Sequence, residues 1–329
     1  MRCFILAGGF ATRLWPLSER RAKPLLPLAG KPLLSTVVES VPNEIAITVS
    51  TNAVFAKDMQ AWAKTINGRT ITIAIEDAGH EGEKLGALGA VSKWLTEENI
   101  DDDVLLIAGD NYVGCPIEKF LAARGANPLI AAHDIGDTEL AKQFGTVIVD
   151  PHPPTPSPEG GRGGIVLSFE EKPLHPKSTL VSTGWWWLPK NSLSVLKEHA
   201  LAHPDNVGGL FEEFLKRGIT VDSFVFTESW HDIGSFESYL HLHKEILDGT
   251  TLCDASSRFS PDSSFNGGNA VGPNVIIKKS VLTDCIVFGD CEIDDCVLQR
   301  CILDTGCRLT GVDLTNQMLR AGTVLKAER

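Results

Sequence analysis

The chain has 329 residues, of which 43% are hydrophobic and 22% charged, and its formal net charge at pH 7 is −12. This length exceeds the usual size of a single core, so we expect two domains in a soluble globular protein. The acidic balance argues against general binding of nucleic acid, and no apolar run predicts a membrane span or a signal peptide. We therefore predict a cytoplasmic protein that binds neither nucleic acid nor membranes.

The first predicted strand, Cys3 to Ala7, is a short apolar run that ends at Gly8 and Gly9. Two glycines let the chain turn sharply and expose backbone N–H groups. The first 31 residues hold six basic side chains and one acidic side chain, a net charge of +5. Because arginine offers a planar fork to two oxygens and lysine a movable point charge, this stretch suits a polyphosphate.

Strands and helices alternate along the chain after this basic stretch. Such an alternation predicts an α/β fold with a doubly wound, mostly parallel sheet, and ligands bind at the carboxyl ends of its strands. Asp110 and the Gly8–Gly9 turn both follow strands, so we expect them to face each other. The predicted elements are the helices Leu33–Val41, Val54–Ile66 and Ala87–Glu97 and the strands Ile45–Ser50, Thr70–Ile75, Val104–Ala108 and Val221–Phe226.

Asp110 ends a buried strand within Gly109-Asp110-Asn111. A carboxylate there is well placed to hold a divalent cation, since Mg²⁺ prefers one or two carboxylates and keeps its waters. The alternative is that Asp110 and Asn111 serve only as turn formers.

Three motifs in the basic stretch carry a family resemblance. They read Leu-Ala-Gly-Gly-x-x-Thr-Arg-Leu-x-Pro-Leu, then Lys-Pro-Leu-x-Pro, then Gly-Lys-Pro-Leu, whereas the P-loop and dinucleotide fingerprints do not occur in the sequence. The order resembles the signature of the sugar-1-phosphate nucleotidyltransferases, and the resemblance extends to about residue 248. Ala11 stands where this family usually has glycine. If the position needs a positive φ, alanine would lower the stability by about 1 kcal/mol. The alternative interpretation of the basic stretch is a strand and a turn with a solvated basic face.

The resemblance implies how the substrates' phosphates are bound. Arg13 would neutralise the leaving pyrophosphate, Lys23 the α-phosphate and Lys172 the attacking phosphate. Asp232, in a Trp-x-Asp-x-Gly motif, would share Mg²⁺ with Asp110, and His231 beside it is interpreted as a spacer. The nucleotide-binding residues implied by the same resemblance are Leu6, Ala7, Gly8, Gly9, Leu85 and Gly86.

The sugar site is implied by motifs between the two aspartates. Glu171 and Lys172 in Glu-Glu-Lys-Pro would bind the sugar and its phosphate, although a surface charge cluster is the alternative. The further sugar-binding residues implied are Asn111, Gly145 and Thr183. Trp185 to Trp187 alternate faces in a strand, and core packing is favoured over sugar stacking.

The base site is implied near Gly82 to Ala90. Glu76 or Glu81 would accept a hydrogen bond from uracil, thymine or guanine, which favours dTTP, UTP or GTP, although a solvated acidic loop is equally plausible. Val207 to Glu213 does not contain the acidic-aliphatic-acidic motif of close thymidylyltransferase relatives. We interpret Pro151 to Gly164, rich in proline and glycine, as a surface insertion in a hairpin.

Five cysteines near the C-terminus, Cys285, Cys291, Cys296, Cys301 and Cys307, recur at spacings of 6, 5, 5 and 6 residues. These spacings fit zinc sites poorly, and disulfides are disfavoured in the cytosol. Small apolar thiols on equivalent positions of a repeat fit better. We predict a short left-handed parallel β-helix of about three coils from about residue 255, reached through a helix that Ser235 caps. The predicted domains are 1–250 and 251–329, and we expect a homo-oligomer through the β-helix.

The resemblance implies that an NTP and a sugar 1-phosphate react to give an NDP-sugar and pyrophosphate, with Mg²⁺ as cofactor. Glucose-1-phosphate thymidylyl or uridylyl transfer is favoured, and mannose-1-phosphate guanylyl transfer is the alternative. A non-catalytic relative that binds nucleotide sugars is a further alternative, disfavoured because the phosphate-binding and metal-binding residues are present. An acyltransferase activity in the β-helix is disfavoured because that part is short.

Overall fold

The computed structural model describes residues 1–150 and 163–328, so the predicted insertion at Pro151 to Gly164 lies outside the described residues except for its last two. Contacts divide the chain into two compact units. The first comprises Met1–Gly9 and Val37–Asp232, and the second Phe10–Thr36 and Ile233–Arg329. The domain boundary after residue 250 stays a prediction.

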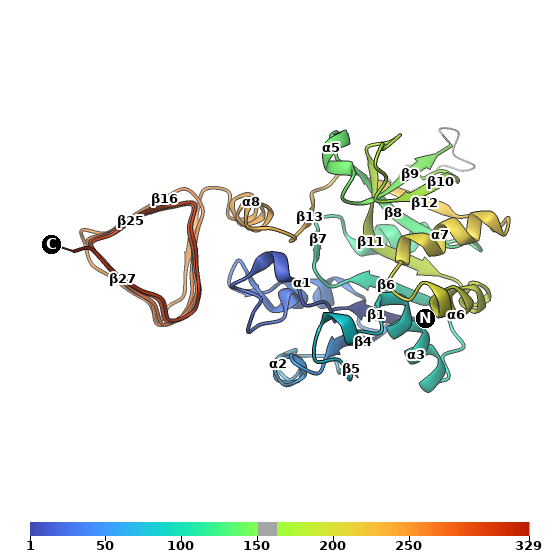
Figure 1. The fold of residues 1–329 in the computed structure, drawn as a ribbon, viewed down its shortest axis with the longest axis horizontal. Helices are drawn as coiled ribbons and strands as arrows, with labels where there is room; N and C mark the ends of the chain where they lie inside the picture. The colour runs from blue at the N-terminus through green and yellow to red at the C-terminus, as the bar shows by residue number, and fades with distance from the viewer. Residues whose placement is uncertain (151–162, 329) are drawn as a thin grey trace. The chain divides into compact units, whose positions relative to one another are not determined.

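The first unit is built on a mixed sheet of nine strands (Figure 1). One half is parallel, in the order β6-β1-β4-β5, and comprises β6 (Val104–Ala108), β1 (Arg2–Leu6), β4 (Ala46–Asn52) and β5 (Ile71–Glu76). The other half joins it through β11, which runs antiparallel to β6 and β8, and β12 is parallel to β8. It comprises β8 (Leu129–Asp134), β9 (Gly145–Val149), β10 (Val166–Glu171), β11 (Leu180–Leu188) and β12 (Asp222–Phe226).

Helices cover this sheet, which confirms the predicted α/β class. α3 packs on α6 and α6 on α7, and their apolar side chains join those of the strands in one core that includes Phe4, Trp94 and Phe211. Trp185 to Trp187 are all buried, so the core-packing interpretation is confirmed. The helices of this unit are α2 (Ala56–Ala63), α3 (Ala87–Glu97), α4 (Ile117–Ala122), α5 (Thr138–Ala141), α6 (Leu193–Ala202) and α7 (Val207–Lys216), and α1 (Leu33–Ser40) spans the boundary between the two units.

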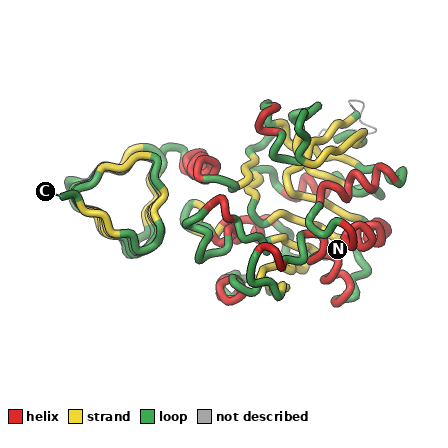
Figure 2. Tube along the Cα trace, viewed as in Figure 1, coloured by secondary structure: helices red, strands yellow, loops and turns green. Residues whose placement is uncertain are grey.

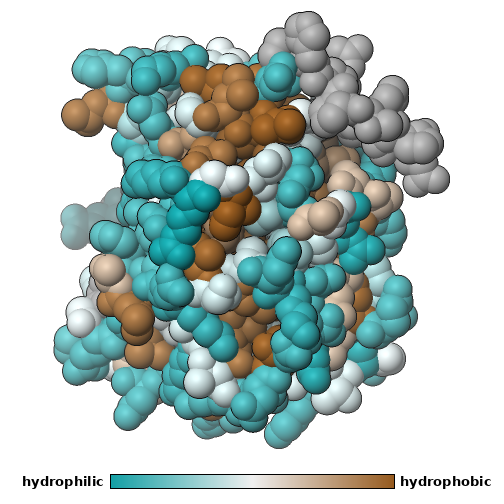
Figure 3. Space-filling model, turned by 90° about the vertical axis from the view of Figure 1, so that its right-hand side faces the viewer, coloured by the Kyte–Doolittle hydropathy of each residue, from teal (hydrophilic) through white to brown (hydrophobic). Residues whose placement is uncertain are grey.

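Figure 3 shows one face of the molecule, on which hydrophilic side chains predominate and hydrophobic ones gather in separate patches. Leu167 on β10 and Leu201 on α6 are two of the large apolar side chains that are exposed on the first unit. None of the described helices is long and apolar enough to cross a membrane.

The second unit contains the predicted parallel β-helix, which is seen end-on as a triangle in Figures 1 and 2. Its three sides are the parallel stacks β14-β17-β20-β23-β26, β15-β18-β21-β24-β27 and β16-β19-β22-β25. The arrangement is consistent with the expected left-handed helix. The expectation of three coils from about residue 255 was too low, because strands begin at Thr251 and four coils are complete before β26 and β27. Because each side has five or six residues, one coil takes about 16 residues, so more than three coils fit in this part of the chain. The strand bounds are β14 (Thr251–Cys253), β15 (Arg258–Phe259), β16 (Ser264–Asn266), β17 (Asn269–Val271), β18 (Ile276–Lys278), β19 (Val281–Thr283), β20 (Ile286–Val287), β21 (Glu292–Asp294), β22 (Val297–Gln299), β23 (Ile302–Leu303), β24 (Arg308–Thr310), β25 (Asp313–Thr315), β26 (Met318–Leu319) and β27 (Val324–Lys326).

The cysteines occupy equivalent positions of successive coils, as predicted. The register stacks Cys285 under Cys301 and Cys291 under Cys307, and all four are buried. Their thiols donate to backbone carbonyls, for example from Cys285 Sγ to the Leu298 oxygen at 3.4 Å. All eight cysteines are free thiols, and the seven that are buried act as small core residues.

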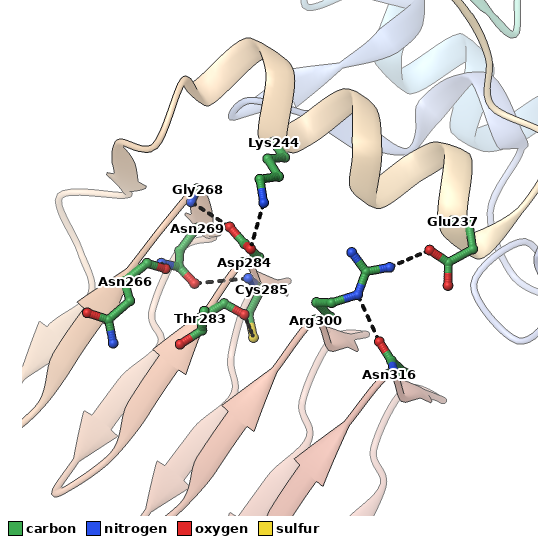
Figure 4. A network of polar contacts seen from close by, with 10 residues as sticks. All are labelled: Glu237, Lys244, Asn266, Gly268, Asn269, Thr283, Asp284, Cys285, Arg300 and Asn316. Atoms are coloured by element: carbon green, nitrogen blue, oxygen red, sulfur yellow. Dashed lines mark hydrogen bonds and ion pairs between the residues drawn. The ribbon is translucent and has the colours of Figure 1, made fainter.

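α8 (Phe236–Leu247) precedes the β-helix, and Ser235 caps it as predicted, because the Ser235 hydroxyl accepts from the Ser238 N–H. Ion pairs join α8 to the coils (Figure 4). Lys244 Nζ lies 3.3 Å from Asp284, and Glu237 pairs with Arg300. These contacts fix the helix on one side of the coils.

Candidate active site

Two strand ends of the first unit meet at the carboxyl edge of the sheet. The Gly109 N–H donates to the Leu6 carbonyl at 2.8 Å, which joins the ends of β6 and β1. β7 (Asn111–Val113) then pairs with β13 (Trp230–Asp232), and the register places Asp232 opposite Asn111. The structure therefore places Asp232 opposite the residue that follows Asp110, although 122 residues separate the two aspartates in the sequence.

Asn111 is held in one orientation between the Asp110 carboxylate and an indole. Its amide nitrogen donates to Asp110 Oδ1 at 3.0 Å, and its oxygen accepts from Trp230 Nε1 at 2.8 Å. Two carboxylates with an amide nearby form a hard oxygen donor set, which is the kind of set that Mg²⁺ takes. Asp110 and Asp232 are thus the residues that could hold a divalent cation.

The glycine turn after β1 is held by polar side chains of β4. The Ala7 N–H donates to Ser50 Oγ at 3.1 Å, and Asn52 Nδ2 donates to the Gly8 carbonyl at 3.0 Å. The sequence analysis missed Ser50 and Asn52. The signal was present, since Ser50-Thr51-Asn52 continues an apolar strand to the same edge of the sheet.

Glu76 ends β5 beside this turn. Its side chain is buried, and a Cβ on Gly8 would lie 3.0 Å from its Oε1. Its Oε2 accepts the Leu85 N–H at 3.2 Å, and burial raises the pKa of the carboxyl above its ordinary value. Glu76 and Leu85 also line a small pocket of about 140 Å³ beside α3. The side chain of Glu81, the other predicted base acceptor, lies outside the described residues.

Gly86 starts α3 where only glycine fits. It has a φ of 79°, and a Cβ there would lie 2.5 Å from the Pro204 oxygen. That oxygen accepts from the N–H groups of Leu88 at 2.7 Å and Gly89 at 3.0 Å. The glycine-rich turn is therefore clamped by the loop that precedes α7.

Glu171 lies between two glycines that come from different elements. A Cβ on Gly145 of β9 would lie 2.9 Å from Glu171 Oε2, and a Cβ on Gly208 of α7 only 2.0 Å from it. Burial raises the pKa of Glu171, and Lys172 Nζ lies 3.6 Å from its Oε1. The sequence analysis predicted Gly145 but missed Gly208, because nothing in Val207-Gly208-Gly209 indicates which strand the helix covers.

β11 passes close to the aspartate edge at its own glycine. Gly184 has a φ of 85°, and a Cβ there would lie 2.6 Å from the Ala108 Cβ and 3.6 Å from Asn111 Cγ. Thr183 before it is fully buried, and its hydroxyl donates to the Ala131 carbonyl at 3.2 Å. Thr183 therefore fastens β11 to β8.

Arg13 and Lys23 belong to the second unit and are described within it. Arg13 is exposed in a 3₁₀ turn, Thr12–Leu14, that follows Ala11. Lys23 is buried at the start of a second such turn, Lys23–Leu25. Together with the groups at the sheet edge, the chain thus offers carboxylates, glycine-lined surfaces and cations of the kinds that a phosphate reaction needs.

Comparisons with known proteins bear on this arrangement. The sequence profile described as "Nucleotidyl transferase" matches residues 2–249. A Sulfolobus acidocaldarius protein named for mannose-1-phosphate guanyltransferase is 28% identical over an alignment of 252 residues that covers 74% of this chain and 62% of that protein. A Streptomyces griseus glucose-1-phosphate thymidylyltransferase is 25% identical over an alignment 346 positions long that covers 95% of this chain and 89% of that protein. The chain thus spans less than two thirds of the Sulfolobus relative.

A crystal structure from Bacillus anthracis, described as a glucose-1-phosphate thymidylyltransferase in complex with sucrose, has the same fold. Its TM-score is 0.61 at 21% identity, and the match covers 74% of this chain and 93% of that one. At this identity the likeness concerns the fold alone. It agrees with the α/β sheet described above.

Proposed function

Since the chain belongs to the nucleotidyl transferase family, we propose that it transfers a nucleotidyl group from an NTP to a sugar 1-phosphate and releases pyrophosphate. The observation that carries the proposal is the β7–β13 register, which pairs Asp232 with Asn111 beside Asp110 at the edge where the Gly8 turn lies. Relatives named for this chemistry support it.

In the proposed reaction, an oxygen of the sugar phosphate forms a bond to the α-phosphorus, and the bond from that phosphorus to the β-phosphate oxygen breaks. Pyrophosphate leaves with the electron pair. A phosphate monoester is already anionic at neutral pH, so no general base is required. What the protein must supply is positioning and neutralisation of charge. We assign Lys172 to the attacking phosphate, Lys23 to the α-phosphate and Arg13 to the pyrophosphate.

Asp110 and Asp232 would hold Mg²⁺, because their oxygens match its preferred ligands. Bound there, the ion would neutralise charge on the phosphate oxygens. Asn111 has a supporting role in this proposal, because its hydrogen bond orients Asp110. We expect no turnover in EDTA and recovery with added Mg²⁺.

We assign sugar binding to the surface around Glu171. A carboxylate accepts hydrogen bonds from two sugar hydroxyls, and the absence of side chains at Gly145 and Gly208 leaves its Oε2 free of a clash. Lys172, 3.6 Å away, then stands where the 1-phosphate would lie. The backbone of Asn111 and the strand that carries Thr183 complete the proposed site.

Two classes of base remain candidates. Thymidylyl or uridylyl transfer to glucose 1-phosphate is the assignment predicted from the sequence, and the name of the Streptomyces relative agrees with it. Guanylyl transfer to mannose 1-phosphate is the second candidate, and Glu76 favours it. Guanine offers two adjacent donors, N1–H and N2–H, to a carboxylate, whereas uracil and thymine offer one donor between two carbonyl oxygens.

A panel of substrates tests the proposal. The protein is incubated with Mg²⁺, glucose 1-phosphate or mannose 1-phosphate, and each NTP in turn, while pyrophosphate release is followed. We expect one pair to exceed the others, and Arg13→Ala or Lys23→Ala to lower kcat about 10²-fold. Equal inactivity with every pair would favour the non-catalytic alternative.

Glu76→Gln separates the two base classes. If Glu76 accepts two guanine donors, glutamine replaces one acceptor with a donor, and kcat/KM for GTP falls at least tenfold. Uracil and thymine could still pair with the amide, so their kcat/KM would fall less or rise. Wild-type GTP use should also weaken as the pH falls through the raised pKa of Glu76, because the protonated carboxyl accepts less well. Preserved GTP preference in Glu76→Gln would contradict the assignment.

A further inference from the structure

A pocket of about 620 Å³ lies entirely within the second unit. Its walls come from the basic N-terminal segment, from His243 on α8 and from the first coils of the β-helix. This volume is in the range of sites for small organic ligands. The proposed reaction assigns no role to the pocket or to the basic residues that line it, Arg21 and Lys31.

The floor of the pocket is an apolar column on the outside of the β-helix. The register stacks Leu252, Ala270 and Ile286 on successive coils, and Ile302 follows on the fourth. Their neighbours Val271 and Val287 point into the coil core. Ile302 and Ile286 are buried, whereas Leu252 is 40% exposed, so the column is covered at one end and open at the other.

His243 supplies an unsatisfied polar atom in the wall. Its Nε2 lies 2.9 Å from the Pro27 carbonyl, and because a carbonyl only accepts, Nε2 carries the hydrogen. Nδ1 is then an acceptor, and it is buried without a hydrogen-bond partner among the described residues. Burial lowers the pKa of His243 to about 4, so the ring stays neutral near pH 7. A buried acceptor without a partner is costly, and a ligand that donates to it would remove that cost.

The residues that line the pocket carry two positive charges, on Arg21 and Lys31, and one negative charge, on Asp254. Arg21 lies 3.3 Å from Asp304 and 4.8 Å from the centre of the Phe288 ring, so its charge is already partly compensated. Lys31 and Asp254 also line the walls. One negative charge therefore suits this pocket better than the several charges of a polyphosphate.

We propose that this pocket binds an organic monoanion with an aromatic or aliphatic body and one hydrogen-bond donor. The body covers the Leu252–Ala270–Ile286 column, the donor faces His243 Nδ1, and the anionic group lies near Lys31. Pro27 and Lys31 belong to the β2–β3 hairpin (Pro27–Leu28 and Lys31–Pro32), which follows Lys23 by only a few residues. An occupant thus fixes the segment that carries Lys23 and changes the rate of the proposed reaction. This regulatory part rests on the proposed function, whereas binding does not.

α8 gives the pocket a rigid wall. Lys244, the next residue after His243, pairs with Asp284 of the coils, and Arg300 joins Glu237 to Asn316 at 2.9 Å (Figure 4). The helix that carries His243 is therefore held to the coils near both of its ends. A ligand meets a preformed wall on this side, which favours binding.

The probe for the test is 1-anilinonaphthalene-8-sulfonate, a fluorescent monoanion with an aromatic body and an N–H donor. It is titrated into the full chain at pH 7.5, and we expect saturable fluorescence from one site. Ala270→Trp fills the floor, and Leu252→Asp places a charge on it. Each should raise Kd at least tenfold. Val297→Trp is the matched control, because Val297 faces outward on another side of the β-helix and is 48% exposed.

His243→Gln keeps a donor for the Pro27 carbonyl but has no counterpart of Nδ1, and it should raise Kd at least threefold. Lys31→Gln should weaken binding and reduce its dependence on salt. Equal binding by wild type and Ala270→Trp, or equal loss in Val297→Trp, would overturn the proposal. Should Ala270→Trp fail to fold, Leu252→Asp and His243→Gln decide the question.

The rate is measured with the best substrate pair, with and without saturating probe. We expect at least a twofold change in wild type and none in Ala270→Trp. An unchanged wild-type rate at full occupancy would overturn the regulatory part. No turnover with any substrate pair would instead count against the proposed function, and the fluorescence titration would still decide whether the pocket binds its ligand.

Discussion

Ala11 has a left-handed backbone, with φ 49° and ψ 45°, where the resembling family usually has glycine. The condition stated from the sequence, that this position needs a positive φ, is therefore met. An alanine in this conformation costs about 1 kcal/mol relative to glycine. Replacing it with glycine would gain less than this, because glycine also makes the unfolded chain more flexible. The Ala11 carbonyl still accepts from Ser18 Oγ at 2.7 Å, which helps to hold the turn.

We predict that Ala11→Gly raises the free energy of unfolding by up to about 1 kcal/mol. Ala61→Gly, the same change inside α2, should lower it by about 1 kcal/mol, because glycine is a poor helix former. Urea unfolding of both variants and wild type measures the difference. Two changes of the same sign would show that the backbone at Ala11 is not strained.

Individual residues also show what the sequence could reveal. Asp110 was identifiable because it follows a predicted strand and Glu171 because it lies in a motif, whereas Glu76 was named with Glu81 as one of two base acceptors that the resemblance implied. Ser50 and Asn52 were not identified, although they continue an apolar strand to the site edge, and Gly208 was not identified because its importance arises from a contact with a residue distant in the sequence. A glycine that makes room for a carboxylate has no local signature.

Among the secondary-structure elements, α7 approaches β10 closely at Gly208. There is no room for a Cβ at position 208, because it would lie 2.0 Å from Glu171 Oε2. We predict that Gly208→Ala pushes the carboxylate away and raises KM for the sugar 1-phosphate at least tenfold, with KM for the NTP nearly unchanged. Val207→Ala, which adds no atoms on the same helix, is the control. Steady-state kinetics with each substrate varied in turn would expose a general loss of folding, since both KM values would then rise.

α8 buries a histidine whose protonation opposes folding. The pKa of His243 is lowered to about 4 by burial, against about 6.5 when unfolded. The unfolded chain therefore takes up a proton as the pH falls below 6.5, whereas the folded chain does so only near 4. This difference removes up to about 3 kcal/mol of stability across that range.

We predict that the loss of unfolding free energy between pH 7 and pH 4 is smaller in His243→Gln, because glutamine cannot titrate. His175→Gln, at an exposed position, is the matched control and should retain the wild-type dependence. Urea unfolding at pH 7, 6, 5 and 4 gives the comparison. Parallel curves for wild type and His243→Gln would mean that His243 is protonated in the folded protein.

Elements with strong local patterns were predicted well, and long-range pairings were not. α3 and β6 have the bounds expected from the sequence, because an amphipathic helix and an apolar strand are local patterns. The insertion of antiparallel β11 between β6 and β8 was not foreseen, since neighbouring strands in a mixed sheet need not be neighbours in sequence. The number of coils was underestimated although the apolar spacing was recognised, because three sides of five or six residues make a coil of only about 16 residues and four such coils are complete after Thr251.

At the scale of the whole chain, the basic N-terminal segment groups with the C-terminal part rather than with its sequence neighbours. Within that unit, Arg21 pairs with Asp304 and lies over Phe288, and the Tyr239 hydroxyl and His243 both donate to the Pro27 carbonyl. The β-helix is therefore part of what orders the segment that carries Arg13 and Lys23.

We predict that deleting residues 251–329 lowers turnover at least tenfold and increases hydrogen exchange in residues 10–36, because the segment loses Asp304 and Phe288. A shorter deletion of residues 317–329 is the matched control. It removes β26 and β27 and the ion pair between Arg320 and Glu19 but keeps the coils that contact Arg21. This control should stay within twofold of the wild-type rate. If the longer deletion left both exchange and turnover unchanged, the basic segment would be ordered without the β-helix, and the coils would need another explanation.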